Sequence, residues 1–148
     1  MSSLRVGFLV YTVLSIIAIC VSSQAVKIIN YQYQGQSLDV KEGNVVGWHI
    51  NYDTKSPNWY INAVGGNSIT IQNVVSAEYL GVGGQGVVTG ADPYEWQQMP
   101  VPGGWYQLAT TDGNEVLQLT GGSDGSAVIL KESYYKGQDA QWGYEPIS

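Results

Sequence analysis

The most constraining feature of this 148-residue sequence is a pattern of apolar segments and turns that occurs three times. Each copy has a Leu-bearing segment, in QSLDVKEGN, EYLGVGGQG and EVLQLTGGSDG, followed by a further apolar segment. Each copy then reaches a tryptophan, in SPNWYI, PYEWQQ and AQWGYE. When the copies are superimposed, equivalent positions hold Leu38, Leu80 and Leu117, and then Trp59, Trp96 and Trp142. A repeat of this kind indicates that one structural unit is built three times.

The repeated segments predict strands rather than helices. They are short, rich in Val, Ile, Tyr, Trp and Thr, and separated by Gly-rich breaks about every 8 to 12 residues, which is typical of an all-β sandwich or barrel. A repeat of about 40 residues also occurs in propeller blades, but propellers need at least four blades. Three pseudo-repeats of four strands each therefore predict an all-β fold of the β-trefoil type, a barrel capped by three hairpins. We expect the repeats at about 26–67, 68–104 and 105–148, with the three tryptophans in one core.

The first 25 residues predict a secretory signal peptide and hence a secreted, extracellular protein. Arg5 supplies the positive start, and the run from Val6 to Val21 is apolar and uncharged. Small residues follow, so that we expect cleavage after Ser23 or Ala25. The competing interpretation is a membrane anchor, but a run of about 16 residues is shorter than the roughly 20 that a spanning helix needs.

The composition after residue 25 excludes several classes of function. The single cysteine and the single arginine both lie in the predicted signal peptide, so residues 26–148 can form no disulfide. Five lysines then stand against twelve carboxylates. This acidic balance argues against nucleic acid, whose phosphates require a basic surface, and against stable association with an anionic membrane. About 125 residues are enough for one domain with its own core, and its oligomeric state stays open.

Two stretches resemble a known family. YINAVGGNSITIQNVVSAEYLGVGG resembles the repeat of fungal ricin-B-type lectins, in which a TIQNV-type hairpin follows a tryptophan-bearing strand, and QSLDV resembles the LDV of ricin-type sugar-binding repeats. The resemblance covers essentially all of residues 26–148. It implies a β-trefoil without enzymatic activity and without a cofactor, whose partners are glycans or glycoconjugates.

The resemblance also implies which residues bind sugar. In such repeats an acid after the second strand accepts hydrogen bonds from sugar hydroxyls and an aromatic ring stacks on the sugar face. In the first repeat the acid corresponds to Asp39, and nearby candidates are Trp48, His49, Tyr52 and Asn58. The second repeat has Gly81 in the acid's position, so we expect no ordinary pocket there. The candidates in the third repeat are Gln118, Tyr134, Tyr135 and Asp139.

One of these assignments has an alternative. Asp39 could instead be a turn acid that accepts backbone N–H groups. The Gln-x-Trp signature of the family is degraded, with Pro57, Tyr94 and Ala140 in place of Gln. Two further tryptophans, Trp48 and Trp105, have no counterpart in the other repeats, which favours ligand contact over a core role.

Other chemistry has weaker support in the sequence. GVGGQG matches the dinucleotide-binding pattern, but no helix follows it. The lone histidine cannot supply a three-ligand zinc site without carboxylates, so we expect no metal. Asp92 and Glu95 are a possible acid pair for glycoside hydrolysis, but they lie in a turn. The alternative function is a trefoil-type protease inhibitor that acts through an exposed loop, for which NYDTKSPN with Lys55 is the candidate, and a surface protein without a ligand is the third interpretation.

Overall fold

The computed structural model describes residues 24–54 and 57–147. Nearly all of the predicted signal peptide, and Lys55 and Ser56 of the candidate inhibitor loop, lie outside these residues. In the part of the chain that the structure describes, no helix has the length and apolar character needed to cross a membrane.

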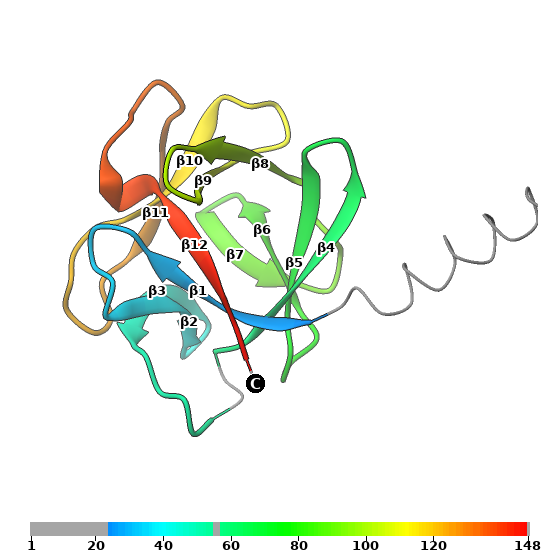
Figure 1. Ribbon diagram of the computed structural model, residues 1–148. Coiled ribbons are helices and arrows are strands. Elements are labelled where there is room, and N and C mark those ends of the chain that lie inside the picture. The colour runs from blue at the N-terminus through cyan, green and yellow to red at the C-terminus, as the bar shows by residue number, and fades with distance from the viewer. Residues whose placement is uncertain (1–23, 55–56, 148) are drawn as a thin grey trace, which may run out of the picture.

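The described residues form twelve strands, four in each repeat (Figure 1). The first repeat contains β1 (Ala25–Asn30), β2 (Gln36–Lys41), β3 (Asn44–His49) and β4 (Trp59–Gly65). The second contains β5 (Ser68–Asn73), β6 (Tyr79–Gly83), β7 (Gly86–Gly90) and β8 (Trp96–Val101). The third contains β9 (Trp105–Ala109), β10 (Glu115–Leu119), β11 (Val128–Glu132) and β12 (Trp142–Pro146), with the short 3-10 helix η1 (Gln138–Ala140) before β12.

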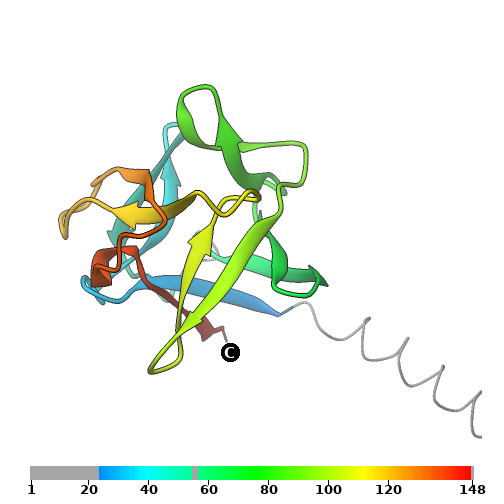
Figure 2. The ribbon, with the colours of Figure 1, turned by 90° about the horizontal axis from the view of Figure 1, so that it is seen from above.

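Six of the strands close a barrel. The antiparallel pairs are β1–β4, β4–β5, β5–β8, β8–β9, β9–β12 and β12–β1, which returns the sheet to its starting strand. The other six strands form the hairpins β2–β3, β6–β7 and β10–β11. Both views show β1 and β12 side by side, with the C-terminal end of the chain close to the start of β1 (Figures 1 and 2). The predicted all-β trefoil is confirmed.

The repeated residues build the core. The three equivalent tryptophans and the three equivalent leucines are all fully buried in one apolar cluster. The indole N–H of Trp59 donates to the backbone oxygen of Leu38 at 3.0 Å, and the same bond joins Trp96 to Leu80 at 2.9 Å and Trp142 to Leu117 at 3.1 Å. A buried indole needs a partner for its N–H, so the leucine in each repeat serves both packing and hydrogen bonding. The prediction that these tryptophans form the core is confirmed.

The third hairpin breaks the threefold symmetry because its turn is longer. The β2–β3 hairpin turns through two residues, Glu42 and Gly43, which both have positive φ as a tight type I′ turn requires. The β10–β11 connection spans residues 120–127 and folds back over β3 of the first repeat. There the backbone N–H of Gly47 donates to the backbone oxygen of Ser126 at 2.9 Å, and that of Gly125 donates to the oxygen of Gly47 at 2.8 Å. The third repeat therefore shapes the surface of the first.

Candidate functional site

The predicted acid of the first repeat lies in a notch, called here the repeat 1 notch. The notch has a volume of about 240 Å³. The β2–β3 hairpin and the segment that follows β3 form it, and its lining consists of Asp39, Lys41, Trp48, His49, Asn51, Thr54 and Pro57. The structure thus brings three of the residues predicted for the first repeat together: Asp39, Trp48 and His49.

Asp39 is a buried acid at this notch. The residue is 1% exposed, its Oδ1 accepts the backbone N–H of Val40 at 2.7 Å, and its Oδ2 lies 3.5 Å from Nζ of Lys41. Burial raises the pKa of the Asp39 carboxyl, although the N–H of Val40 and the charge of Lys41 oppose the rise. The equivalent positions of the other repeats hold Gly81 and Gln118, so the fold itself does not require an acid here.

Trp48 and His49 form a wall of the notch, and both have partners that limit their movement. Nζ of Lys41 lies 4.7 Å from the centre of the half-buried Trp48 ring, a cation–π contact. His49 is exposed, but Asp124 of the β10–β11 connection accepts its backbone N–H at 2.8 Å and bonds its Nδ1 at 2.7 Å. Gln36 donates to the same carboxylate at 3.0 Å. The pKa of Asp124 is lowered by these hydrogen bonds from Gln36 and His49.

Sequence reasoning missed Asp124 because it lies in another repeat. The segment GGSDG identifies it only as a turn acid, and nothing in its neighbourhood predicts that the turn reaches the first repeat. The one available signal is length, since eight residues connect β10 to β11 where two connect β2 to β3.

The other two residues predicted for the first repeat do not line the notch. Asn58 is 3% exposed, and its Oδ1 accepts a hydrogen bond from Nζ of the buried Lys27 at 2.8 Å. Tyr52 is exposed, and its hydroxyl donates to Oε1 of Glu145 on β12 at 2.6 Å. Asn58 is thus used in a buried hydrogen bond with Lys27, and Tyr52 lies on the side of the loop that faces β12.

Lys27 explains the path of this loop. It is 1% exposed in the middle of β1, and its ammonium group lies 5.7 Å from the centre of the Tyr52 ring. Burial lowers the pKa of Lys27, while the negative charges of Asp39 and Glu145 oppose this change. A buried cation needs hydrogen-bonding partners, which ties Asn58 to β1. The signal in the sequence is a lysine inside the otherwise apolar segment AVKII.

The second repeat has Gly81 at the position equivalent to Asp39, and its equivalent notch contains Gly81, Asp92 and Tyr94 among its lining residues. A Cβ atom on Gly81 would lie 3.0 Å from Cβ of Tyr94, so the tyrosine occupies the space that an acid would need. The Tyr94 ring packs edge-on against Trp96 with its centre 4.9 Å away. In this repeat, packing between Tyr94 and Trp96 thus takes the place of the carboxylate that Asp39 provides in the first repeat.

Three of the residues predicted for the third repeat lie together. Asp139 accepts hydrogen bonds on both oxygens, from Nε2 of Gln118 at 2.9 Å and from the hydroxyl of Tyr135 at 2.8 Å. The bond to Asp139 raises the pKa of the Tyr135 hydroxyl. Tyr134 is 78% exposed and belongs to none of these bonds. A ligand here would have to replace hydrogen bonds that the residues already make with one another.

Metal binding finds no support in residues 24–54 and 57–147. No group of three or more His, Cys, Asp or Glu side chains there is arranged to hold a metal ion. The chemistry that the repeat 1 notch can offer is therefore hydrogen bonding and aromatic contact.

The fold is shared with solved structures of lectins. No protein-family model matches the sequence, and comparison with curated proteins finds no match. A ricin B-like lectin of Macrolepiota procera, solved in complex with lactose, is 23% identical with a TM-score of 0.74, and the match covers 84% of this chain and 96% of that one. The Rhizoctonia solani agglutinin is 19% identical with a TM-score of 0.74, and the match covers 84% of this chain and 95% of that one.

Trefoil domains within larger enzymes also match. An endo-β-galactosidase from Clostridium perfringens that releases GlcNAcα1-4Gal is 20% identical with a TM-score of 0.72, and the match covers 84% of this chain and 33% of that one. The chain therefore has the fold of ricin B-like lectins, which also occurs as one part of glycosidases.

Proposed function

We propose that this chain is a secreted carbohydrate-binding protein of the ricin B-like type, which holds a glycan in the repeat 1 notch. One observation carries the proposal: Asp39 is a buried carboxylate with a raised pKa at a position where the other repeats have Gly81 and Gln118. Burying an acid costs stability, and the fold accepts uncharged residues at this position. Acids with pKa values perturbed in this way occur preferentially at functional sites.

The neighbouring side chains fit a sugar ligand. A carboxylate accepts hydrogen bonds from two sugar hydroxyls, and an indole such as that of Trp48 offers an apolar surface to a pyranose ring. His49 adds a further polar group whose position is fixed by Asp124 at 2.7 Å. A volume of about 240 Å³ suits one sugar residue of a longer chain, so that the notch would bind the end of a glycan.

The proposal includes no catalysis. Asp39 lies against Lys41 and a backbone N–H, and among the described residues the notch lining contains no second carboxylate for acid–base hydrolysis. The cluster of Gln118, Tyr135 and Asp139 is a second candidate sugar site. Both oxygens of Asp139 accept side-chain hydrogen bonds at 2.8–2.9 Å. Asp39 instead accepts one backbone N–H, and its other oxygen lies 3.5 Å from Nζ of the partly exposed Lys41.

The described part of the loop in the inhibitor alternative is exposed at residues 51–54, as an inhibitory segment must be, and buried at its end, at Pro57 and Asn58. Burial therefore does not decide between the two functions, and the experiment below tests both. Secretion is part of the proposal because of the apolar run of residues 6–21 and the small residues after it.

A glycan array probed with residues 24–148 tests the proposal, with Asp39→Asn as the variant and Asp112→Asn as the matched control. Asp112 is an exposed acid in a turn of the third repeat and is not among the residues that line the notch. We expect the wild type and the control to bind the same glycans and Asp39→Asn to lose at least part of them. An array without signal, together with inhibition of a panel of serine and cysteine proteases, would replace this function with the inhibitor alternative.

A further inference from the structure

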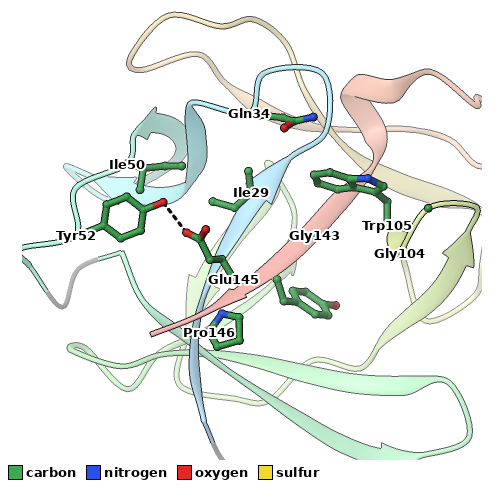
Figure 3. Close-up of a pocket in the computed structure, with 11 residues that line it drawn as sticks. Ile29, Gln34, Ile50, Tyr52, Gly104, Trp105, Gly143, Glu145 and Pro146 are labelled. Atoms are coloured by element: carbon green, nitrogen blue, oxygen red, sulfur yellow. Dashed lines mark hydrogen bonds between the residues drawn. The ribbon is translucent and has the colours of Figure 1, made fainter. Parts of the chain in front are cut away.

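A second pocket lies on the outer face of the barrel, over the pair β1–β12, and is called here the seam pocket (Figure 3). Its volume is about 390 Å³. Ile29, Gly143 and Glu145 lie along its two strands, Trp105 stands on one side and Tyr52 on the other, with Gln34 at one end and Pro146 at the opposite end. None of these residues lines the repeat 1 notch.

The Trp105 ring is held in place as a preformed wall. One face stacks on the ring of Tyr31, with centres 4.5 Å apart and planes 10° from parallel. The edge of the ring rests on Gly143, where a Cβ would lie 2.7 Å from Cζ3 of the indole. Any larger residue than glycine would therefore displace the ring. One face of this half-buried indole is covered by Tyr31, and the residue lines the pocket with surface that Tyr31 does not cover.

This arrangement occurs at one junction of the threefold fold. Equivalent positions can be counted from the core tryptophan of each repeat. Gly143 is then equivalent to Tyr60 and Gln97, and Glu145 is equivalent to Asn62 and Met99. Counted along the first strand of each repeat, Trp105 corresponds to Ser68 and Ala25. Gly143, Glu145 and Trp105 thus all differ from the residues at the equivalent positions of the other repeats. Packing of the shared core does not require these differences, and a half-exposed tryptophan is a feature of binding surfaces.

The polar groups of the pocket favour a neutral ligand with hydroxyl groups. Glu145 is exposed, and the hydroxyl of Tyr52 uses only its Oε1, at 2.6 Å. A free organic cation is the other ligand that an aromatic ring and a carboxylate attract. Here, however, Lys27 is paired with Glu145 in the β1–β12 register, and its ammonium group lies 5.7 Å from the centre of the Tyr52 ring. The cationic position beside the Tyr52 ring and Glu145 is thus already filled by the protein.

We propose that the seam pocket is a second saccharide-binding site, in which a neutral pyranose stacks on Trp105 and donates hydroxyl hydrogen bonds to Glu145. The chemistry is that of an apolar sugar face on an aromatic ring and of hydroxyls on a carboxylate. A volume of about 390 Å³ accommodates one or two sugar rings. The segment of residues 50–54 separates this pocket from the repeat 1 notch, because Ile50 and Tyr52 line the former while Asn51 and Thr54 line the latter. One protein molecule would then present two sites, which raises its avidity for a branched glycan.

The test combines variants with direct detection at Trp105. Lactose, cellobiose and N,N′-diacetylchitobiose are titrated to millimolar concentrations into the protein labelled with ¹⁵N, and the indole N–H signal of Trp105 is followed. At least one of these sugars should shift that signal in the wild type and in Asp39→Asn. Glu145→Gln keeps an acceptor for Tyr52 and should weaken this binding about tenfold or more. Met99→Gln changes the symmetry-equivalent exposed position in the second repeat and should leave the affinity unchanged.

The outcomes separate the two proposed sites. If none of the three sugars moves the Trp105 signal, or if Glu145→Gln binds as the wild type does, the seam pocket is not a sugar site. A shift produced by tetramethylammonium chloride and by no sugar would assign the pocket to cations and overturn the proposal. If Asp39→Asn loses glycans on the array while the Trp105 signal never responds, the repeat 1 notch stands alone. If Trp105 responds while Asp39→Asn binds every glycan normally, the seam pocket is the site and the notch is not.

Discussion

Replacing Asp39 with asparagine removes the charge of the buried acid and little else. Asparagine has nearly the same shape, and its side-chain oxygen can still accept the backbone N–H of Val40, as Oδ1 of Asp39 does at 2.7 Å. Lys41 loses a carboxylate 3.5 Å away, but the Lys41 side chain is 43% exposed, and such pairs contribute about 0–1 kcal/mol. The variant therefore reports what the negative charge does.

The expected change in stability has a definite sign. Burial raises the pKa of Asp39 above its value in the unfolded chain, so the folded state binds the proton more tightly. Ionisation at neutral pH then costs about 1.4 kcal/mol of folding free energy for each unit of pKa difference. This cost is present above the folded pKa and disappears below the unfolded pKa of about 3.9. Asp39→Asn should therefore be at least as stable as the wild type at pH 7, and the difference should vanish near pH 3.

The expected change in binding has the opposite sense. Loss of charge-assisted hydrogen bonds from sugar hydroxyls should weaken glycan binding by about 1.5–3 kcal/mol, which is roughly ten- to hundredfold. Urea unfolding between pH 3 and pH 7 measures the first effect, and calorimetric titration with the strongest glycan of the array measures the second. A variant that gains stability while it loses its ligand would show that the charge of Asp39 serves glycan binding and not the fold.

Asp112→Asn is the control with the opposite sign. Hydrogen bonds from the backbone N–H of Asn114 and the hydroxyl of Thr110 lower the pKa of Asp112. Its contribution to stability is therefore present above the unfolded pKa and is lost as pH falls through the folded pKa. We expect this control to be less stable than the wild type at pH 7 and to bind glycan normally. If Asp39→Asn also loses around 1 kcal/mol of stability at pH 7 with its affinity intact, Asp39 serves the fold and the reasoning is refuted.

Three further predictions follow from the fold and the sequence. Trp96→Ala should lower the free energy of unfolding by about 3–5 kcal/mol, as should the equivalent change in each of the other repeats, because all three indoles are fully buried; a nearly neutral result in chemical denaturation would contradict their equivalence. Asp124→Ala should release the β10–β11 connection, which hydrogen exchange would detect as faster exchange at the amide of Gly47, and unchanged protection there would refute the role of the carboxylate. Protein recovered from the medium of expressing cells should begin at Gln24 or Val26, and full-length protein retained in a carbonate-washed membrane pellet would support an anchor instead.

The fold could be predicted because its determinants repeat. Equivalent leucines and tryptophans occur in three copies, and the structure gives each pair the same hydrogen bond between indole and backbone oxygen. A feature that appears three times in one sequence can be recognised without any other sequence. The notch residues Asp39, Trp48 and His49 could be predicted for a related reason, since they belong to a hairpin whose register follows from the repeat.

The positions of Tyr52 and Asn58 could not be predicted because they belong to no repeated strand. Their segment takes its path from Lys27, which binds Asn58 at 2.8 Å, and from Glu145, which binds Tyr52 at 2.6 Å. Both partners are distant in sequence, and a buried lysine is rare enough that a strand position would not suggest one. Trp105 was recognisable as an unrepeated aromatic, but its partner Tyr31 is set by the pairing of strands from different repeats.

The pairing of β1 with β12 also has a consequence for how the chain reaches its native state. Val26 lies opposite Pro146, so the closing contact of the barrel joins residues 120 positions apart. Contacts of such large sequence separation carry a high loop-closure entropy and slow folding, and this one cannot form until β12 has left the ribosome. A ligand in the seam pocket would touch both of these strands at once, and by mass action it would favour the closed barrel over any form in which the two strands have parted. Saccharide binding would then stabilise the pairing of β1 with β12, which joins the two ends of the barrel.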